Sequence, residues 1–138
     1  MKKLLFLILC TTTLGLVSCK KDTIINETPN RTFIYTIQPN SWTLNSAKDT
    51  YTTILDINEI DGVTMDDEGI LIYITDPNNP NVQRQLPFVY NLDTYSYEFK
   101  TGEIKIHIQS PDAQDTEPFA PTKPITAKVI IIPSTFQP

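Results

Sequence analysis

The chain has 138 residues, a length typical of one domain, and 40% of them are hydrophobic. Eleven prolines against four glycines and two cysteines exclude a collagen, a flexible low-complexity chain and a disulfide scaffold. The formal net charge of −5 excludes the basic surface that nucleic-acid binding requires, so we expect no nucleic-acid partner.

The N-terminus has the layout of a secretory signal peptide, with two lysines after Met1 and an apolar stretch at 4–17. This stretch ends in the sequence Leu-Val-Ser-Cys at 16–19, which resembles the lipobox of bacterial lipoproteins. The resemblance implies that the Cys19 thiol carries a diacylglycerol, that the signal is cleaved before Cys19 and that the new amino group is usually acylated. An ordinary signal peptide with a chance cysteine is the alternative.

Lipidation would decide how the protein is held in the cell envelope. Cleavage removes two of the 11 basic residues and none of the 16 acidic ones, so the formal charge changes from −5 to −7. Such a chain is not attracted to an anionic bilayer, so the lipid must hold it. Each buried CH₂ contributes about 0.8 kcal/mol, and two or three acyl chains on Cys19 make attachment nearly permanent. We therefore expect anchoring to the outer membrane, on a side that the sequence leaves open.

Three parts follow from this reading: a signal peptide at 1–18, a lipidated cysteine with a flexible tether at 19–30, and a folded domain at 31–138. The tether is polar, shows no periodicity and spans on the order of 15–20 Å. Within it, Asp-Thr-Ile at 22–24 resembles an O-glycosylation acceptor of some gram-negative bacteria, which makes Thr23 a candidate glycosylation site; a chance match is the alternative.

From Arg31 onward, apolar residues alternate with polar ones and helical periodicity is absent, which predicts strands. A cluster of Asp, Asn and Pro at 76–81 predicts a turn between two of them. The predicted strands lie at 33–37, 51–57, 70–74, 82–90, 94–100, 103–109 and 125–132.

Two hairpins set the register of the three middle strands. We expect a four-residue loop at 91–94 and a two-residue turn at 101–102. The predicted cross-strand pairs are Tyr90–Tyr95, Phe88–Tyr97, Leu86–Phe99, Phe99–Ile104, Tyr97–Ile106 and Tyr95–Ile108 on an apolar face, with Glu98–Lys105 and Lys100–Glu103 on a polar face. A slip by one residue would exchange the two faces, so the hydrophobic pattern specifies this arrangement.

A sheet with one apolar face needs a second layer, and because no helix is predicted in the folded domain, that layer must be another sheet. The predicted fold is therefore an all-β, antiparallel sandwich of seven to eight strands, immunoglobulin-like or jelly-roll-like, after an N-terminal signal helix and tether. The strand sequences at 51–57, 69–73, 86–87, 97–99 and 129–133 resemble those of a family of small gram-negative lipoproteins of unknown function. That family brings no catalytic residues, and this chain lacks the collagen-like segment that many members carry.

Catalytic motifs are scarce in the sequence. The single histidine, His107, falls on the polar face of a strand, where a solvated side chain is expected rather than a catalytic one. A triad with Ser96 lacks a nucleophile elbow and an oxyanion loop. We therefore expect no enzyme, and a small hydrolase is the remote alternative.

An acidic segment is the first candidate binding site. Calcium prefers six to eight oxygen ligands, several of them carboxylates. The candidate ligands lie within thirteen residues and are Asp56, Glu59, Asp61, Asp66, Asp67 and Glu68. Their spacing matches no EF-hand, and a solvated loop is the alternative. No other cofactor is expected.

Aromatic residues near loops form the second candidate site. Pro118, Pro121 and Pro124 recur every third residue around Phe119, which favours a polyproline II segment that could dock a partner. Trp42 and the pair Tyr90 and Tyr95 could form an aromatic platform for a sugar. The alternatives are packing of these rings in the core and a loop in which Phe119 covers the edge of the core. The sequence thus predicts a non-enzymatic, lipid-anchored envelope protein that presents loops to an envelope protein or a glycan, with calcium binding as a competing hypothesis.

Overall fold

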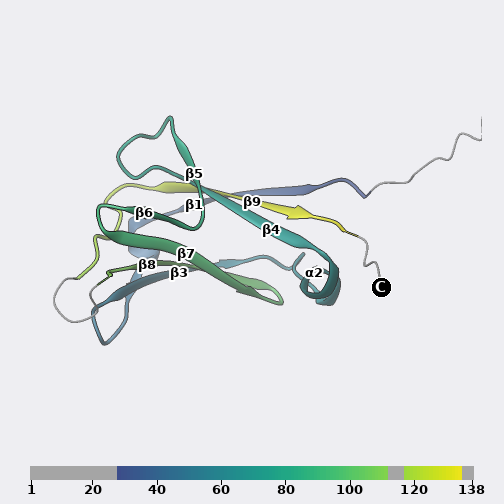
Figure 1. The fold of residues 1–138 in the computed structure, drawn as a ribbon, viewed down its shortest axis with the longest axis horizontal. Helices are drawn as coiled ribbons and strands as arrows, with labels where there is room; N and C mark the ends of the chain where they lie inside the picture. The colour runs from purple at the N-terminus through teal and green to yellow at the C-terminus, as the bar shows by residue number, and fades with distance from the viewer. Residues whose placement is uncertain (1–27, 112–116, 135–138) are drawn as a thin grey trace, which may run out of the picture.

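The computed structural model of the chain describes residues 28–111 and 117–134. In these residues, two antiparallel sheets pack as the layers of a sandwich (Figure 1). The predicted all-β sandwich is confirmed. The signal peptide, Cys19 and Thr23 lie outside the described residues, as does most of the predicted tether.

One sheet has four strands and the other has five. The four-stranded sheet has the order β1 (Arg31–Ile37), β9 (Ile125–Ile132), β4 (Gly69–Thr75) and β5 (Gln83–Gln85). The five-stranded sheet has the order β2 (Thr43–Leu44), β3 (Thr50–Asp56), β8 (Glu103–Gln109), β7 (Asp93–Lys100) and β6 (Phe88–Tyr90). The described residues thus form nine strands rather than seven to eight.

The prediction of a single strand at 82–90 is wrong. The segment divides into β5, which pairs with β4 in one sheet, and β6, which pairs with β7 in the other. Between them lies Leu86, which is buried and donates its backbone N–H to the Ile72 oxygen at 2.8 Å. Pro87 follows and has no N–H for a strand ladder, so pairing ends there and the chain crosses to the second sheet.

The predicted loop at 91–94 is also wrong, because the β6–β7 hairpin turns on Asn91 and Leu92 alone. Its register pairs Phe88 with Tyr95 and Tyr90 with Asp93, two residues away from the predicted pairing. Both turn residues have positive φ, 49° and 74°, as the tight hairpin turn that matches strand twist requires. A shift by two residues preserves the faces, so the aromatic side chains stay on the apolar side.

The β7–β8 hairpin has the predicted register, with Tyr97 opposite Ile106 and Glu98 opposite Lys105. Gly102 takes the positive φ of 77° at its turn, so Thr101 needs no left-handed conformation. The backbone of Gly102 also donates to the Ile60 oxygen at 2.8 Å, which fixes this hairpin to the segment after β3.

The core lies between the sheets and is built mainly from isoleucine, whose branched side chain suits a strand. The buried residues alternate along β4, β8 and β9, as the twofold periodicity predicts. They include Ile72, Ile74, Ile104, Ile106, Ile108, Val129 and Ile131.

One short helix, α2 (Gly62–Asp67), corrects the expectation that the folded domain contains no helix. Asp61 caps its first turn, since Oδ1 accepts hydrogen bonds from the N–H groups of Val63 and Thr64, both at 3.0 Å. Thr64 is fully buried and anchors the helix against the sandwich. Within the described ranges, none of the helices has the length and apolar character needed to cross a membrane.

Candidate functional site

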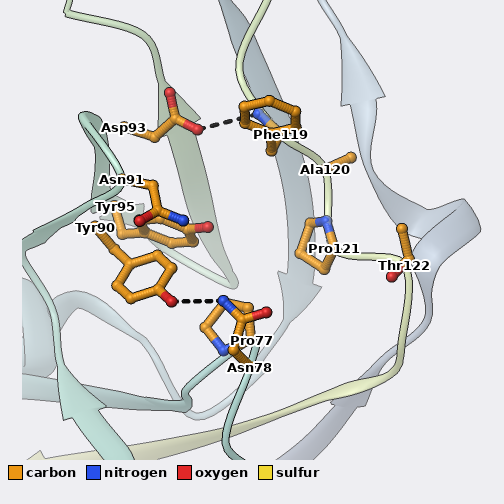
Figure 2. Close-up of a pocket in the computed structure, with 10 residues that line it drawn as sticks. All are labelled: Pro77, Asn78, Tyr90, Asn91, Asp93, Tyr95, Phe119, Ala120, Pro121 and Thr122. Atoms are coloured by element: carbon orange, nitrogen blue, oxygen red, sulfur yellow. Dashed lines mark hydrogen bonds between the residues drawn. The ribbon is translucent and has the colours of Figure 1, made fainter.

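Three of the four predicted binding aromatics, Tyr90, Tyr95 and Phe119, line one pocket at an end of the sandwich (Figure 2). The pocket has a volume of about 290 Å³. It is built from the β4–β5 loop, the β6–β7 hairpin and the segment before β9. Its lining residues are Pro77, Asn78, Tyr90, Asn91, Asp93, Tyr95, Phe119, Ala120, Pro121 and Thr122.

Tyr90 forms one wall of the pocket and is held from two sides. The Asn78 side-chain amide donates to the Tyr90 hydroxyl at 2.5 Å (Figure 2). The Arg84 guanidinium lies 5.4 Å from the centre of the Tyr90 ring and 5.6 Å from that of Phe88, within the range of a cation–π contact. These contacts restrict the ring before any ligand arrives.

Asp76 organises the loop that carries Asn78. This carboxylate is 5% exposed, pairs with the Arg84 Nε at 2.5 Å and accepts the backbone N–H groups of Asn78 and Asn79 at 2.8 and 3.1 Å. Burial alone would raise the pKa of Asp76, but the hydrogen bonds from Arg84 and the two amides outweigh it and hold the pKa below its ordinary value. The predicted turn at 76–81 is therefore a loop built around a buried charge.

Tyr95 and Asp93 lie deeper in the pocket. Tyr95 is 3% exposed and belongs to the hydrophobic core, so the alternative of core packing holds for this ring although it also lines the pocket. Its ring stacks on Phe88 with 4.7 Å between centroids. Burial, followed by the charge of Asp93, raises the pKa of Tyr95 to about 12, so its hydroxyl stays protonated at neutral pH. Asp93 is buried as well, and its Oδ2 accepts the backbone N–H of Phe119 at 3.0 Å (Figure 2).

Phe119 projects from the opposite wall. Its side chain is 77% exposed, so the alternative in which Phe119 covers the edge of the core is wrong. The described part of the proline-containing segment, residues 117–124, holds no helix or strand. It is tied to the sandwich at Asp93 and by the Tyr51 hydroxyl, which donates to the Glu117 carboxylate at 2.7 Å. An exposed aromatic ring is thus carried on an anchored backbone.

Trp42 does not belong to this pocket. It follows the short 3₁₀ helix η1 (Pro39–Ser41), is 7% exposed and packs in the core. Its indole nitrogen is buried without a hydrogen-bond partner in the part of the chain that the structure describes. The alternative of core packing therefore holds for Trp42, and the prediction of a sugar platform at this residue is wrong.

Two of the six predicted calcium ligands, Asp61 and Glu68, are engaged in contacts with neighbouring protein groups. Asp61 caps α2, and the hydrogen bond from the Thr64 N–H holds the pKa of its carboxyl below the ordinary value. Glu68 accepts from the Thr64 hydroxyl at 2.6 Å and pairs with Arg31 at 2.5 Å. Asp56 is the last residue of β3, and Glu59, Asp66 and Asp67 lie in or beside the segment that forms α2. Across residues 28–111 and 117–134, no three Asp, Glu, His or Cys side chains gather as a metal-binding group, so this arrangement does not support a calcium site.

His107 lies on the outer face of the five-stranded sheet, opposite Ser96 in β7. Its Nδ1 is 2.9 Å from the Thr52 hydroxyl, and its Nε2 is 3.6 Å from a Glu98 oxygen. It contributes to an open depression of about 560 Å³ that is separate from the aromatic pocket. The histidine is thus satisfied by neighbours on the sheet surface.

Sequence reasoning missed the polar half of the pocket. Asn78 lies in the predicted turn at 76–81, and Asn91 and Asp93 lie in the predicted loop at 91–94. The sequence pattern of these segments indicates turns and gives no sign of a binding site. Only the packing of the two sheets brings these segments together.

Comparison of the chain with protein-family models, with curated proteins and with solved structures finds no match. The class of the protein is therefore defined by its own geometry. It is an all-β sandwich with a mixed aromatic and polar pocket at one end.

Proposed function

We propose that this chain is a lipid-anchored cell-envelope protein, attached to the outer membrane through Cys19, whose sandwich is a non-enzymatic interaction domain. The lipobox-like sequence at 16–19 supports the anchor. The observation that carries the interaction domain is the convergence of the β6–β7 hairpin, which carries Tyr90 and Tyr95, and the distant Phe119 on one pocket with restrained walls.

The chemistry of the pocket favours binding over group transfer. Tyr95 keeps its proton at neutral pH, and Asp93 uses a carboxylate oxygen to hold the backbone of Phe119. Both groups are therefore suited to position a ligand, and the protonated Tyr95 hydroxyl is not available as a general base at neutral pH.

The direction of the pocket fits an anchored protein. Arg31, the first residue of β1, pairs with Glu68 beside the start of β4, whereas the pocket residue Pro77 follows the end of β4. The seven residues of β4 extend about 3.4 Å each, so the two ends of this strand lie roughly 20 Å apart. Figure 1 shows the start of β1 and the β4–β5 loop, which carries Pro77, at opposite ends of the sandwich. A tether that joins β1 to Cys19 would therefore attach to the sandwich at the end opposite the pocket.

Replacement of Cys19 by serine tests the anchor. We expect the wild-type protein to fractionate with the outer membrane and to carry acyl mass on its N-terminal peptide, and Cys19→Ser to lose both. A serine variant that remains attached, or a wild-type protein without acyl mass, would overturn the anchor.

Site-specific photo-cross-linking in the native cells tests the interaction domain. A photoreactive residue at position 119 should capture an envelope component, whereas the same residue at position 89 should not. Val89 is the matched control because it is 65% exposed and does not line the pocket. Equal capture at the two positions, or none at position 119, would overturn the pocket as the site of interaction.

A further inference from the structure

We propose that the pocket binds a neutral saccharide, with one sugar ring packed against Phe119 and its hydroxyl groups bonded to the polar side chains opposite. This inference rests on the proposed function, because it names the ligand class of the same pocket. It does not depend on which side of the outer membrane the protein occupies.

The lining combines the two kinds of surface that a sugar presents. A pyranose ring has C–H groups on its faces, which pack on aromatic rings, and hydroxyl groups around its edge, which both donate and accept hydrogen bonds. Phe119 offers an open aromatic surface, while Asn78, Asn91 and Asp93 offer amide and carboxylate groups from the other segments of the pocket (Figure 2). Asn78 and Asp93 already bond to the Tyr90 hydroxyl and to the Phe119 N–H, and a purely apolar ligand would leave their remaining hydrogen-bonding capacity unused.

Phe119 is well placed as the packing surface. Its ring is open to solvent at the mouth of the pocket, and binding would cover it. The hydrogen bond from its N–H to Asp93 fixes the backbone, so the cost of ordering the ring on binding is reduced.

The charges around the pocket favour a neutral ligand. Among the described residues that line it, none is basic, and the one charged side chain is the carboxylate of Asp93. An anionic sugar or a phosphate would therefore meet repulsion without a compensating cation. The Arg84 guanidinium already lies over the Tyr90 ring at 5.4 Å, so the face of the ring that it covers is closed to a cationic ligand.

The size of the pocket suits a single sugar unit. Its volume of about 290 Å³ lies at the lower end of the roughly 300–1,000 Å³ typical of small-molecule sites. One ring of a longer glycan would occupy it, and the remaining units would extend into solvent. We accordingly expect modest affinity for one unit, raised in the envelope by many copies on one surface.

A panel of immobilised oligosaccharides tests this inference. The probes are neutral hexose, deoxyhexose and N-acetylhexosamine oligomers, with uronic-acid and sulfated oligomers as the anionic comparison. The full-length lipidated protein is applied in a detergent that contains no sugar headgroup. We expect binding to at least one neutral member, confirmed by titration calorimetry with the same oligomer in solution.

Variants connect the binding to the pocket. Phe119→Ala should weaken the affinity at least about tenfold, as truncation of a central aromatic contact does. Val89→Ala removes an equally exposed apolar side chain outside the pocket and should leave the affinity unchanged. Because Phe119 is exposed, Phe119→Ala should retain the thermal midpoint of the wild type, which separates lost binding from lost folding.

Several outcomes would overturn the inference: binding to no neutral member of the panel, binding to anionic members alone, or equal binding by wild type and Phe119→Ala. A protein captured by cross-linking at position 119, together with a panel that shows no binding, overturns the saccharide and leaves the interaction domain intact. Absence of capture at position 119 instead counts against the proposed function itself.

Discussion

The carboxylate of Asp93 accepts the backbone N–H of Phe119, with 3.0 Å between Oδ2 and N. These residues are 26 positions apart, and one is 6% exposed while the other is 77% exposed. Asp93, the first residue of β7, thus fixes the backbone of the exposed Phe119 in the irregular segment before β9. Such a contact couples the stability of the sandwich to the geometry of the pocket.

Removal of this carboxylate should release the segment around Phe119. We expect Asp93→Ala to lower the free energy of unfolding by about 1.5–3 kcal/mol, the range for a hydrogen bond to a charged group. Chymotrypsin should also cleave after Phe119 faster, because the segment opens more often. Asp93→Asn, which keeps an acceptor oxygen, is the control and should cleave at nearly the wild-type rate. Equal cleavage of wild type and Asp93→Ala would show that the contact does not hold the segment.

The β6–β7 turn offers a test of the observed register. Leu92 has a φ of 74°, and a left-handed conformation costs such a residue roughly 1–2 kcal/mol. Leu92 is largely exposed, so its replacement loses little packing. Leu92→Gly should therefore raise the free energy of unfolding by about 1 kcal/mol in chemical denaturation, whereas Leu92→Ala should give no such gain. A four-residue loop would predict no difference between the glycine and alanine variants.

The pairing of Asp76 with Arg84 should make stability depend on pH. The folded-state pKa of Asp76 lies below the ordinary value of 3.8, so the unfolded chain binds more protons in the interval between these two pKa values. The contribution of Asp76 to the free energy of unfolding is therefore complete above the pKa of the unfolded chain, and it is lost as the pH falls through the pKa of the folded state. Asp76→Asn should reduce the free energy of unfolding at neutral pH and flatten its decline in acid.

Asp61 and Asp49 also have lowered pKa values, so the Asp76→Asn variant should retain part of the acid sensitivity of the wild type. The measurement to compare is the difference in the free energy of unfolding between wild type and Asp76→Asn, followed from neutral pH through the acidic range. If that difference is the same at neutral and at acidic pH, the charge of Asp76 does not stabilise the loop.

The acidic segment should behave as a helix cap instead of a calcium site. Asp61→Ala should lower the thermal midpoint because the N–H groups of Val63 and Thr64 lose their acceptor, whereas Asp61→Asn keeps an acceptor oxygen and should lower the midpoint much less. Added calcium should leave the midpoint of the wild type unchanged. A rise on calcium addition that disappears in the double variant Asp66→Asn and Asp67→Asn would restore the calcium hypothesis.

The extent to which these features could be predicted differs between the two hairpins. The β7–β8 register was correct because Gly102 supplies an unambiguous turn and the charge pairs on the polar face agree with the apolar pairs. The β6–β7 register was wrong by two residues, and the hydrophobic pattern could not reveal it. A shift by two leaves every side chain on the same face, and Leu92 is a poor signal for a turn that needs positive φ.

Trp42 illustrates a different limit. An aromatic residue that follows Pro-Asn-Ser at 39–41 resembles a loop residue, yet its ring packs in the core. Burial depends on which elements cover a position, and alternation along the strand does not report it. The same reasoning applies to the pocket. The sequence identifies the pair Tyr90 and Tyr95, and separately Phe119, as candidates, but it does not predict that they share one site with Asn78 and Asp93.

Local order in the polypeptide was sufficient to establish that this is an all-β protein with two faces per sheet, because strand periodicity sorts neighbouring side chains without reference to the rest of the molecule. Three-dimensional packing alone decided the sheet change between β5 and β6, the burial of Trp42 and the assembly of the pocket. The physical reason is that each depends on contacts between segments far apart in the chain, and a pattern with a period of two residues carries no information about distant partners.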